Sequence, residues 1–362
     1  MIESYKLYKN PGSLDKEEKE KYKKYKENLK KYRIRATKRD FCVFRKHFIN
    51  EGKDPSLIIP AYVTNNLLTP VLNPIDYRGY FEDKNMFDKI LPKEYLPITR
   101  YRKMNGIWCD EAYKKILFDK VMEGLNALEG NARIIIKPSK DTSSGRGIKL
   151  LNKINGEWCE GKEDKKINLK KILENWGESD LIIQDVLQQA DFFSQFCSTS
   201  VNTMRLVVYN SPVTGRCDLI WGGMRIGAKG SIVDNSHQGG MMIGINKDGC
   251  LYKFLNDQYG NRYTSFNGID FDKQDFIIPN YSEIIKFTKE IAFYLLPHRF
   301  IAFDIMVDKK GEVKVIEFNL RGYSGWLCQM AGDPMYGAQT EEILEYITSH
   351  RKMGNKVFYS IS

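Results

Sequence analysis

The sequence predicts an α+β fold, with groups of antiparallel strands and helices packed beside them. Apolar runs at 300–307 and 312–319 flank a polar Asp-Lys-Lys-Gly turn, which is the pattern of a β-hairpin. A β-branched strand, a Ser/Gly-rich loop and a second strand follow one another at 133–151. Residues 281–294, just before the late hairpin, have the apolar spacing of an amphipathic helix. Strand pairs with helices beside them lead us to expect a mixed, layered architecture.

The composition is that of an ordinary globular protein. The chain has 362 residues, 42% of them hydrophobic and 12% aromatic, enough for one large domain or two to three smaller ones. The sequence contains no apolar run long enough to cross a membrane, and its first nine residues lack the apolar core of a secretion signal. The seven cysteines show neither zinc-site nor disulfide spacing, which indicates reduced thiols. We therefore expect a cytoplasmic protein.

The positive charge is concentrated at the N-terminus. The net charge is +10, and residues 1–53 hold 17 basic against 8 acidic side chains. Because the remainder is close to neutral, the distribution argues against a nucleic-acid-binding surface. The basic arm could contact an anionic membrane, an acidic polysaccharide or the glycan machinery. The simpler interpretation is a solvated helix of mixed charge.

The N-terminal part is predicted to begin with a long helix. Residues 14–39 are rich in Lys, Glu and Tyr, with few prolines or glycines. Within them Tyr22, Tyr25, Leu29 and Tyr32 recur at steps of three and four residues. We expect this aromatic stripe to pack on the body of the protein.

The rest of the chain contains short strands and helices. A loop with a short strand is predicted at 56–73, where prolines interrupt apolar residues, and a turn at 105–106. Helices are predicted at 83–91 (with Asp83 near the cap), 111–127, 169–176 and 335–350. Extended segments are predicted at 96–101, 133–138, 148–151, 180–187, 203–209, 218–226 and 239–245.

Polar side chains interrupt both strands of the late hairpin. Asp304 lies in the first strand and Glu317 and Asn319 in the second, where residues two apart share a face. Carboxylates in buried strands are costly unless a cation neutralises them, and Mg²⁺ takes carboxylate and amide oxygens. The three residues are candidate magnesium ligands. The alternative is a surface hairpin whose polar residues face water.

A polar loop follows the strand at 133–138. Lys137 ends that strand, and a loop containing Ser143 and Gly147 comes next. Backbone amides in such a loop can converge on a phosphate, because glycine leaves room for close approach. The loop lacks the spacing of a Walker P-loop and no helix follows it. A flexible surface hairpin would have the same pattern.

The order of these features resembles the ATP-grasp superfamily over residues 81–325. The order is Asp-Lys at 83–84, a strand ending in Lys-Pro, the Ser/Gly loop, a strand ending at 184–187, and Asp…Glu-x-Asn near the C-terminus. The motifs at 200–205, 224–227, 231–235 and 239–240 are similar to a narrower group. That group is the sugar-transfer-associated ATP-grasp family, often encoded with surface-polysaccharide genes.

The resemblance implies a nucleotide site in which each residue is assigned by its position in the motifs. The implied contacts are Lys84 and Lys137 to the phosphates, Ser143, Ser144, Gly145, Arg146 and Gly147 over the β- and γ-phosphates, Gln184, Asp185 and Leu187 at the adenine, and Asp191 at the ribose. Asp304, Glu317 and Asn319 would hold two magnesium ions that bridge the phosphates.

Arginines and one histidine complete the expected site. Arg205, Arg225 and Arg321 would supply positive charge to the transferring phosphoryl group and to the acyl-phosphate oxyanion. His237, in a polar loop, is a candidate general base for an incoming amine. An ion pair is the alternative role for each arginine, and an uninvolved surface residue is the alternative for the histidine.

The implied activity is an ATP-dependent ligase that joins a carboxylate to an amine or another nucleophile, in the modification of a cell-surface polysaccharide. One alternative is an ATP-grasp kinase that phosphorylates a sugar or another hydroxyl acceptor. Another is a nucleotide-binding accessory protein of a glycan assembly complex. The expected division is an N-terminal helical and α/β region at 1–104, a lid at 105–185, and a larger catalytic part at 186–362, with ATP held between the last two.

Overall fold

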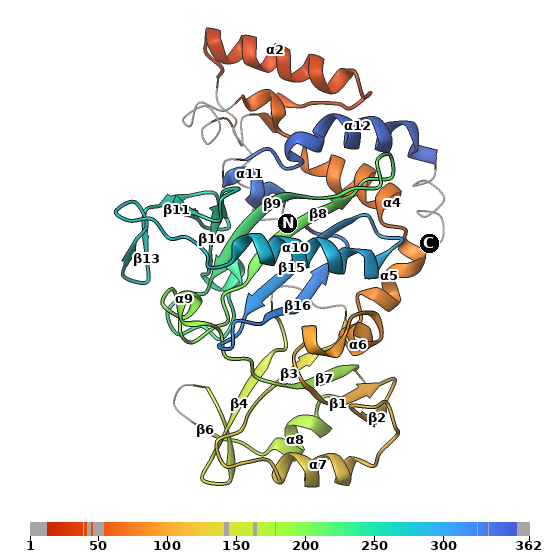
Figure 1. Cartoon of the computed structure of the whole chain (residues 1–362), viewed down its shortest axis with the longest axis vertical. Coiled ribbons are helices and arrows are strands. Elements are labelled where there is room, and N and C mark those ends of the chain that lie inside the picture. Colours follow the sequence, from red (N-terminus) through yellow and green to blue (C-terminus); the bar gives the residue numbers. More distant parts are fainter. Residues whose placement is uncertain are drawn as a thin grey trace.

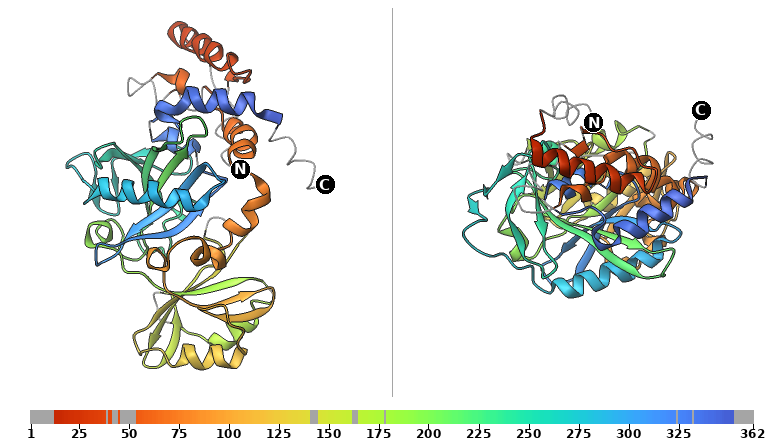
Figure 2. Two further views of the ribbon diagram at one scale, coloured as in Figure 1. Left: turned by 45° about the vertical axis from the view of Figure 1, so that its right-hand side comes forward. Right: turned by 90° about the horizontal axis from the view of Figure 1, so that it is seen from above.

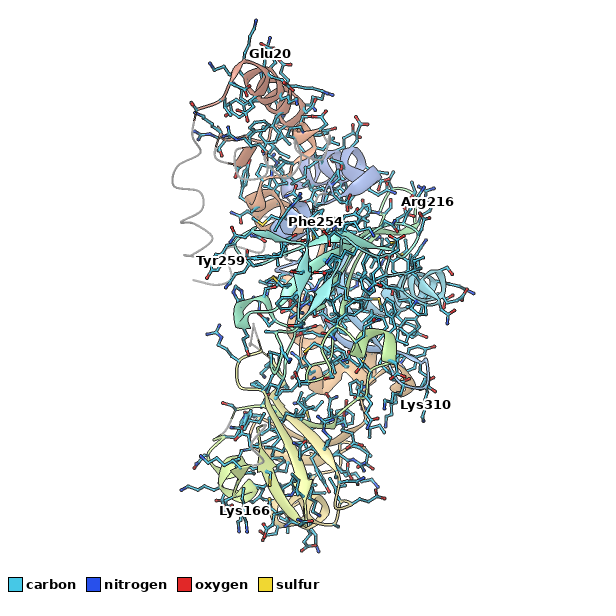
Figure 3. All side chains as sticks on the ribbon, turned by 90° about the vertical axis from the view of Figure 1, so that its left-hand side faces the viewer. Glu20, Lys166, Arg216, Phe254, Tyr259 and Lys310 are labelled. Atoms are coloured by element: carbon cyan, nitrogen blue, oxygen red, sulfur yellow. The ribbon has the colours of Figure 1, made fainter. Side chains whose placement is uncertain are left out.

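The computed structural model contains two seven-stranded antiparallel sheets, arranged one after the other along the long axis of the molecule (Figure 1). It describes residues 13–38, 40–41, 45, 54–140, 145–161, 165–177, 179–323, 325–331 and 333–352. The N-terminal helix lies at one end of the molecule, and the helices of the first sheet lie at the other. In Figure 3, Glu20 and Lys166 mark these two ends.

The first sheet has the strand order β2-β1-β7-β3-β4-β5-β6. Its strands are β1 (Thr99–Met104), β2 (Ile107–Asp110), β3 (Arg133–Pro138), β4 (Lys149–Ile154), β5 (Glu157–Glu160), β6 (Lys165–Lys166) and β7 (Leu181–Asp185). Helices α7 (Phe118–Asn126) and α8 (Leu169–Glu174) cover one face, where Val121 and Leu173 pack on Ile134 and Ile183. Because strand side chains alternate between faces, Lys137 and Gln184 lie on the opposite face, toward the second sheet.

The second sheet has the strand order β12-β11-β10-β9-β8-β15-β16. Its strands are β8 (Met204–Asn210), β9 (Cys217–Ile226), β10 (Met241–Ile245), β11 (Leu251–Asn256), β12 (Arg262–Tyr263), β15 (Phe300–Val307) and β16 (Val313–Asn319). Helix α10 (Tyr281–Ile291) covers one face. Helices α11 (Gly325–Met330) and α12 (Thr340–Ser349) cover the other, together with the N-terminal helices.

The N-terminal helix α2 (Lys16–Lys30) begins with a capping box. The Asp15 carboxylate accepts a hydrogen bond from the Glu18 amide, and the Glu18 side chain accepts one from the Asp15 amide. Tyr25 and Leu29 of the predicted stripe are buried in one cluster with residues of α12, which confirms that the stripe packs on the body. Figure 2 shows α2 and α12 close together in both views.

The segment between α2 and the first sheet is helical, and the prediction of a loop with a short strand at 56–73 is wrong. It forms a 3₁₀ turn η1 (Pro55–Leu57), a π-helix η2 (Val63–Leu68) and helix α4 (Thr69–Leu72). Pro70 does not end a helix here, because it lies in the first turn of α4, where an amide donor is not needed.

Short helices then lead from α4 to the first sheet. They are α5 (Ile75–Phe81), η3 (Lys84–Met86), α6 (Phe87–Ile90) and η4 (Lys93–Tyr95). Asp83 caps η3 as predicted, since its side chain accepts a hydrogen bond from the Asn85 amide.

Other predicted helices begin later or end earlier than expected. Helix α7 begins at Phe118 instead of 111, because Tyr113 has a φ of 65° and a bridge pairs Cys109 with Lys115. Helix α12 begins at Thr340, after the 3₁₀ turn η7 (Gly337–Gln339). The remaining short elements are α9 (Asp191–Ser194), η5 (Ser236–Gln238), β13 (Ser265–Phe266), β14 (Ile269–Asp270) and η6 (Ala292–Leu295).

Candidate active site

Charged side chains line up across three neighbouring strands of the second sheet. Asp304 of β15 pairs in register with Glu317 of β16 on one side and with Arg205 of β8 on the other. Residues directly opposite each other in a sheet project to the same face, so these three side chains form a row. Asn319 pairs with Ala302, two residues before Asp304, and therefore lies on that face as well.

Two arginines bind the Asp304 carboxylate. Arg205 makes a bidentate contact, with Nε 2.6 Å from Oδ1 and Nη2 2.8 Å from Oδ2, and Arg225 Nη1 lies 3.0 Å from Oδ2. Burial alone would raise the pKa of Asp304, but the two guanidinium groups lower it below its ordinary value. Asp304 is therefore ionised, and burial of the cluster makes each contact electrostatically strong.

Arg225 is shared between two carboxylates. Its Nη2 lies 2.9 Å from Oδ1 of Asp234, on the loop between β9 and β10. The other Asp234 oxygen accepts hydrogen bonds from the Thr203 amide at 2.9 Å and the Thr203 hydroxyl at 2.5 Å. Burial raises the pKa of Asp234, and Arg225 opposes that effect. The sequence pattern around 231–235 did not identify Arg225 as the partner of Asp234, because that contact is fixed only when β8 and β9 pair.

Lysines from outside the second sheet complete the cluster. Lys84 Nζ, in the first turn of η3, lies 2.8 Å from Oε1 of Glu317. Lys137 of β3 is 7% exposed. Burial lowers its pKa to about 8, aided by the nearby Lys84 and opposed by Glu317. Four cations and three carboxylates thus meet where the first sheet faces the second.

Oxygen atoms suited to magnesium are present in this cluster. Among the described residues, Glu317 Oε2 and Asn319 Oδ1 accept no hydrogen bond, while Glu317 Oε1 binds Lys84. Carboxylate and amide oxygens are the ligands that Mg²⁺ prefers, so the residues present fit this ion. The described residues include no group of three or more His, Cys, Asp or Glu side chains placed to hold a metal. A site here would use two carboxylates, an amide and ligand oxygens.

The glycine loop lies between β3 and β4. Ser143 and Ser144 are outside the described residues. Gly145 and Gly147 have φ values of 68° and 77°, which an L-residue rarely adopts. A Cβ atom on Gly145 would approach Val233 and Gln238, so this loop contacts the loop that carries Asp234. Arg146 between them is exposed.

The predicted adenine contacts lie at the end of β7. Gln184 is 6% exposed, its Nε2 lies 3.1 Å from Thr99 Oγ1, and its Oε1 has no partner in the part of the chain that the structure describes. The Asp185 carboxylate makes a bidentate contact with Arg100, at 2.8 and 2.7 Å. The Leu187 amide and carbonyl make no backbone hydrogen bond within the described chain. Asp191 is exposed at the start of α9.

Two predicted catalytic residues lie at the edge of the cluster. Arg321 is exposed, with Nε 3.4 Å from Oε2 of Glu82, two residues before Lys84. His237 is exposed in η5, where Nδ1 lies 2.5 Å from Oε1 of Gln258. Within the described ranges no hydrogen bond or ion pair joins His237 to the charged row, and its role as a base stays a prediction.

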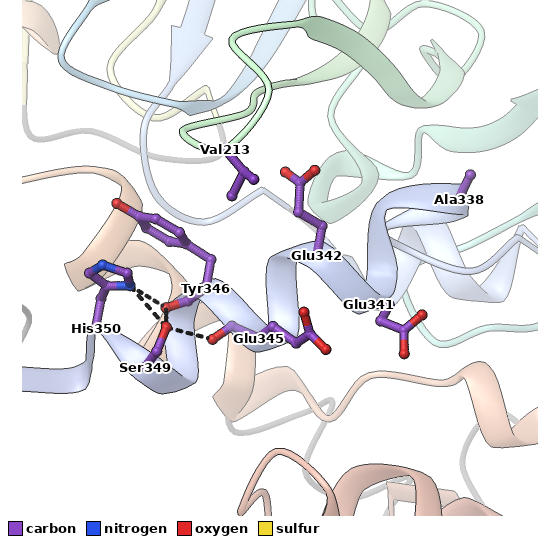
Figure 4. A pocket seen from close by; sticks show the side chains of 8 residues that line it. All are labelled: Val213, Ala338, Glu341, Glu342, Glu345, Tyr346, Ser349 and His350. Carbon is purple, nitrogen blue, oxygen red and sulfur yellow. Dashed lines mark hydrogen bonds between the residues drawn. The ribbon is translucent and has the colours of Figure 1, made fainter.

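A separate pocket lies beside α12 and contains none of the predicted site residues (Figure 4). Its lining residues are Val213, Ala338, Glu341, Glu342, Glu345, Tyr346, Ser349 and His350. Glu342 accepts hydrogen bonds from Tyr209 and Ser211, so it serves the packing of α12 on the sheet.

Solved structures with a similar arrangement were found at low sequence identity. N5-carboxyaminoimidazole synthetase from Staphylococcus aureus, complexed with ADP, is 9% identical over 70% of this chain and 50% of its own, with a TM-score of 0.39. D-alanyl-alanine synthetase A from Vibrio cholerae is 10% identical over 76% of this chain and 66% of its own, with a TM-score of 0.41. L-amino acid ligase from Bacillus licheniformis is 11% identical over 69% and 44%, with a TM-score of 0.34. This chain spans half the length of the carboxyaminoimidazole synthetases it matches.

The family comparison covers most of the sequence. No curated protein matches the chain. None of the helices in the described ranges is both long and apolar enough to span a membrane. The model of the family described as sugar-transfer associated ATP-grasp matches residues 64–343, which contain both sheets and the whole charged row. The chain therefore belongs to the sugar-transfer associated ATP-grasp family.

Proposed function

We propose that the chain is an ATP-dependent, ADP-forming ligase that joins a carboxylate to an amine, or to another nucleophile, through an acyl phosphate. Family membership supports an ATP-grasp enzyme. One observation carries the proposal: Lys84 of η3 pairs with Glu317 of the second sheet, and the buried Lys137 of the first sheet lies near both. This concentration of buried charge between two sheets is suited to a polyanion such as a triphosphate.

The two lysines have the clearest role in binding. Lys137 has little access to water and its pKa is lowered, so a phosphate would supply the negative charge that this site lacks. Lys84 is already paired with Glu317 and can turn toward a phosphate oxygen. Glu317, Asn319 and Asp304 would hold magnesium, which supplies further neutralisation of phosphate charge when bound.

The proposed reaction has two steps, and no protein group bonds covalently to the substrate. A carboxylate oxygen of the acid attacks the γ-phosphorus of ATP, the bond to the β-phosphate bridge oxygen breaks, and ADP leaves. The amine nitrogen then attacks the acyl carbon, phosphate leaves, and the amine loses a proton. Both steps gather negative charge on oxygens, which fixed guanidinium groups stabilise. Arg205 and Arg225 are held in place by Asp304 and are suited to that task.

We also propose that the acid or its acceptor belongs to a surface polysaccharide or its precursors. The support is the family description, which refers to sugar transfer. A uronic acid joined to an amino acid is one such pair.

The test uses purified protein with ATP, Mg²⁺ and panels of uronic acids and amines. A ligase releases ADP only when both an acid and an amine are present. With an ¹⁸O-labelled carboxylate, one ¹⁸O should appear in the released phosphate, because the attacking oxygen leaves with phosphorus. A stable phosphorylated product without an amine would instead identify a kinase. A chain that binds nucleotide but converts neither an acid nor a hydroxyl acceptor would retain only the accessory role.

A further inference from the structure

We infer that Asp234 is a positioning residue that keeps Arg225 in place when Asp304 turns its oxygens toward a cation. The inference rests on the proposed function, because it assigns Asp304 to magnesium and Arg225 to the reacting phosphoryl group. Asp234 itself touches neither. It acts through the arginine, which it contacts at 2.9 Å.

Asp304 is held more firmly by Arg205 than by Arg225. Asp304 carries three arginine contacts, two from Arg205 and one from Arg225. The contact from Arg225 is a single Nη1 bond of 3.0 Å, whereas Arg205 is bidentate at 2.6 and 2.8 Å. A cation at Asp304 would compete first with the weaker contact, because bidentate pairs hold better. Arg225 would then depend on its second anchor.

That second anchor is rigidly built. One Asp234 oxygen is used entirely by Thr203, through its amide and its hydroxyl, which leaves the other oxygen for Arg225. The backbone of this loop is closely packed at Gly240, because a Cβ atom there would lie 2.6 Å from the carbonyl oxygen of Asp234. Asp234 is 7% exposed, so water cannot replace it cheaply as the partner of Arg225.

The same loop joins the arginine to the glycine loop of the first sheet. Val233 and Gln238, on either side of Asp234, are the nearest neighbours of a Cβ atom built on Gly145, at 3.5 and 3.4 Å. The loop that carries Asp234 therefore contacts both Arg225 and the described part of the glycine loop.

Asp234→Asn tests the inference, because asparagine keeps the size and the bonds to Thr203 but loses the ion pair. We expect kcat to fall by about 10- to 100-fold, with the KM for ATP changed less than about threefold, as for a misplaced transition-state contact. Asp218→Asn is the matched control. Asp218 lies on the same strand as Arg225, accepts a bond from Gln339 and is 3.8 Å from Arg216. The Asp218→Asn variant should be as active as the wild type.

A double-mutant cycle separates positioning from general destabilisation. If Asp234 acts through Arg225, then Asp234→Asn should cause no further loss in an Arg225→Ala background. Full additivity of the two losses would overturn the inference, and so would an unchanged kcat in the single variant. If Asp234→Asn unfolds, Thr203→Val takes its place. This change removes only the hydrogen bond from the Thr203 hydroxyl to Asp234 and should give a smaller fall in kcat.

Hydrogen exchange gives a readout that does not need turnover. Arg225→Ala should speed amide exchange in residues 231–240 and 145–147, whereas Asp218→Asn should not. Unchanged exchange in Arg225→Ala would overturn the link between arginine and loop. If the wild type binds ATP but converts no acid tested, the proposed function fails, and the exchange result still decides the role of Asp234.

Discussion

At the scale of single residues, the site contains charged side chains whose burial destabilises the folded chain. Among the described residues no carboxylate makes an ion pair with Lys137, and its pKa is lowered to about 8 by burial and by Lys84. A lysine in this state destabilises the folded chain at neutral pH. Such a cost is expected where the group serves a ligand and not the fold.

Lys137→Met should therefore stabilise the protein while weakening ATP binding. We expect Tm at pH 7 to rise by about 1–2 °C, which corresponds to ~1 kcal/mol in a chain of 362 residues. The folded-state pKa of about 8 lies below the unfolded value of 10.5, so the gain is full below pH 8 and shrinks as the pH approaches 10.5. Calorimetry across this range measures the effect. The control is Lys149→Met, since Lys149 is paired with Glu160 and partly exposed. A Tm of Lys137→Met below that of Lys149→Met would contradict the reasoning.

Glu317→Gln should abolish ATP-dependent turnover without unfolding the chain. The change removes one charge from the proposed magnesium site and weakens the pair with Lys84, so nucleotide binding should also depend less on magnesium. A coupled ADP assay and fluorescent-nucleotide titrations with and without Mg²⁺ measure both effects. Glu312→Gln is the control, because Glu312 pairs with Lys314 on the same hairpin. A fully active Glu317→Gln enzyme would remove this residue from the site.

At the scale of elements, hairpins determine where the reactive groups lie. The β15–β16 pair brings Asp304 opposite Glu317, and the β8–β15 pair adds Arg205. The β3–β4 pair carries Lys137 and the glycine loop. Because antiparallel partners project to one face, each hairpin supplies a pair of groups and the sheet orders the pairs into a row.

Gly147→Ala should impair ATP binding more than stability explains. At a φ of 77° an alanine costs about 1 kcal/mol of backbone strain, and its Cβ would lie 3.0 Å from Pro138 Cγ. Gly156→Ala, in the next turn of the same sheet, is the matched control. Gly156 has a similar φ of 83°, but a Cβ atom there would meet open space. Gly147→Ala should lose somewhat more stability than Gly156→Ala in denaturant titrations, because of the contact with Pro138, but only Gly147→Ala should raise the KM for ATP several-fold. Equal KM values would show that the loop does not reach the nucleotide.

At the scale of the whole molecule, the two ends of the chain share one core. Tyr25 of α2, Ile343 of α12 and Tyr336, which precedes η7, belong to a single buried cluster on the outer face of the second sheet. The basic helix α2 is thus part of the folded body through one face. Its contact with a membrane or with glycan machinery stays a prediction for its exposed face.

Tyr25 tests how strongly that shared core holds α2. Its ring is fully buried and its hydroxyl has no hydrogen-bond partner among the described residues, so Tyr25→Phe should leave stability unchanged or raise it by about 1 kcal/mol. Tyr25→Ala should cost about 3–5 kcal/mol, as for aromatic truncation in other cores. Thermal unfolding of the two variants gives the difference. A large loss in Tyr25→Phe would reveal a partner for the hydroxyl.

Sequence alone determined most elements and the family, but not the contacts of the site. Period-two and period-3.6 patterns identified the strands and most helices, because these patterns depend on neighbours along the chain. They failed at 56–73, where Pro70 fits the first turn of a helix. They placed Glu317 and Asn319 on one face, because residues two apart on a strand share a face, but only the strand register showed that Asp304 lies on that face too.

Only the tertiary structure decided which charges meet. Asp304 proved to be bound by Arg205 and Arg225, and Arg225 to be shared with Asp234. Lys84 and Glu317 lie far apart in the chain, yet their side chains are 2.8 Å apart. Such contacts depend on the order in which strands pair and on how the two sheets face each other, and neither leaves a local pattern in the sequence.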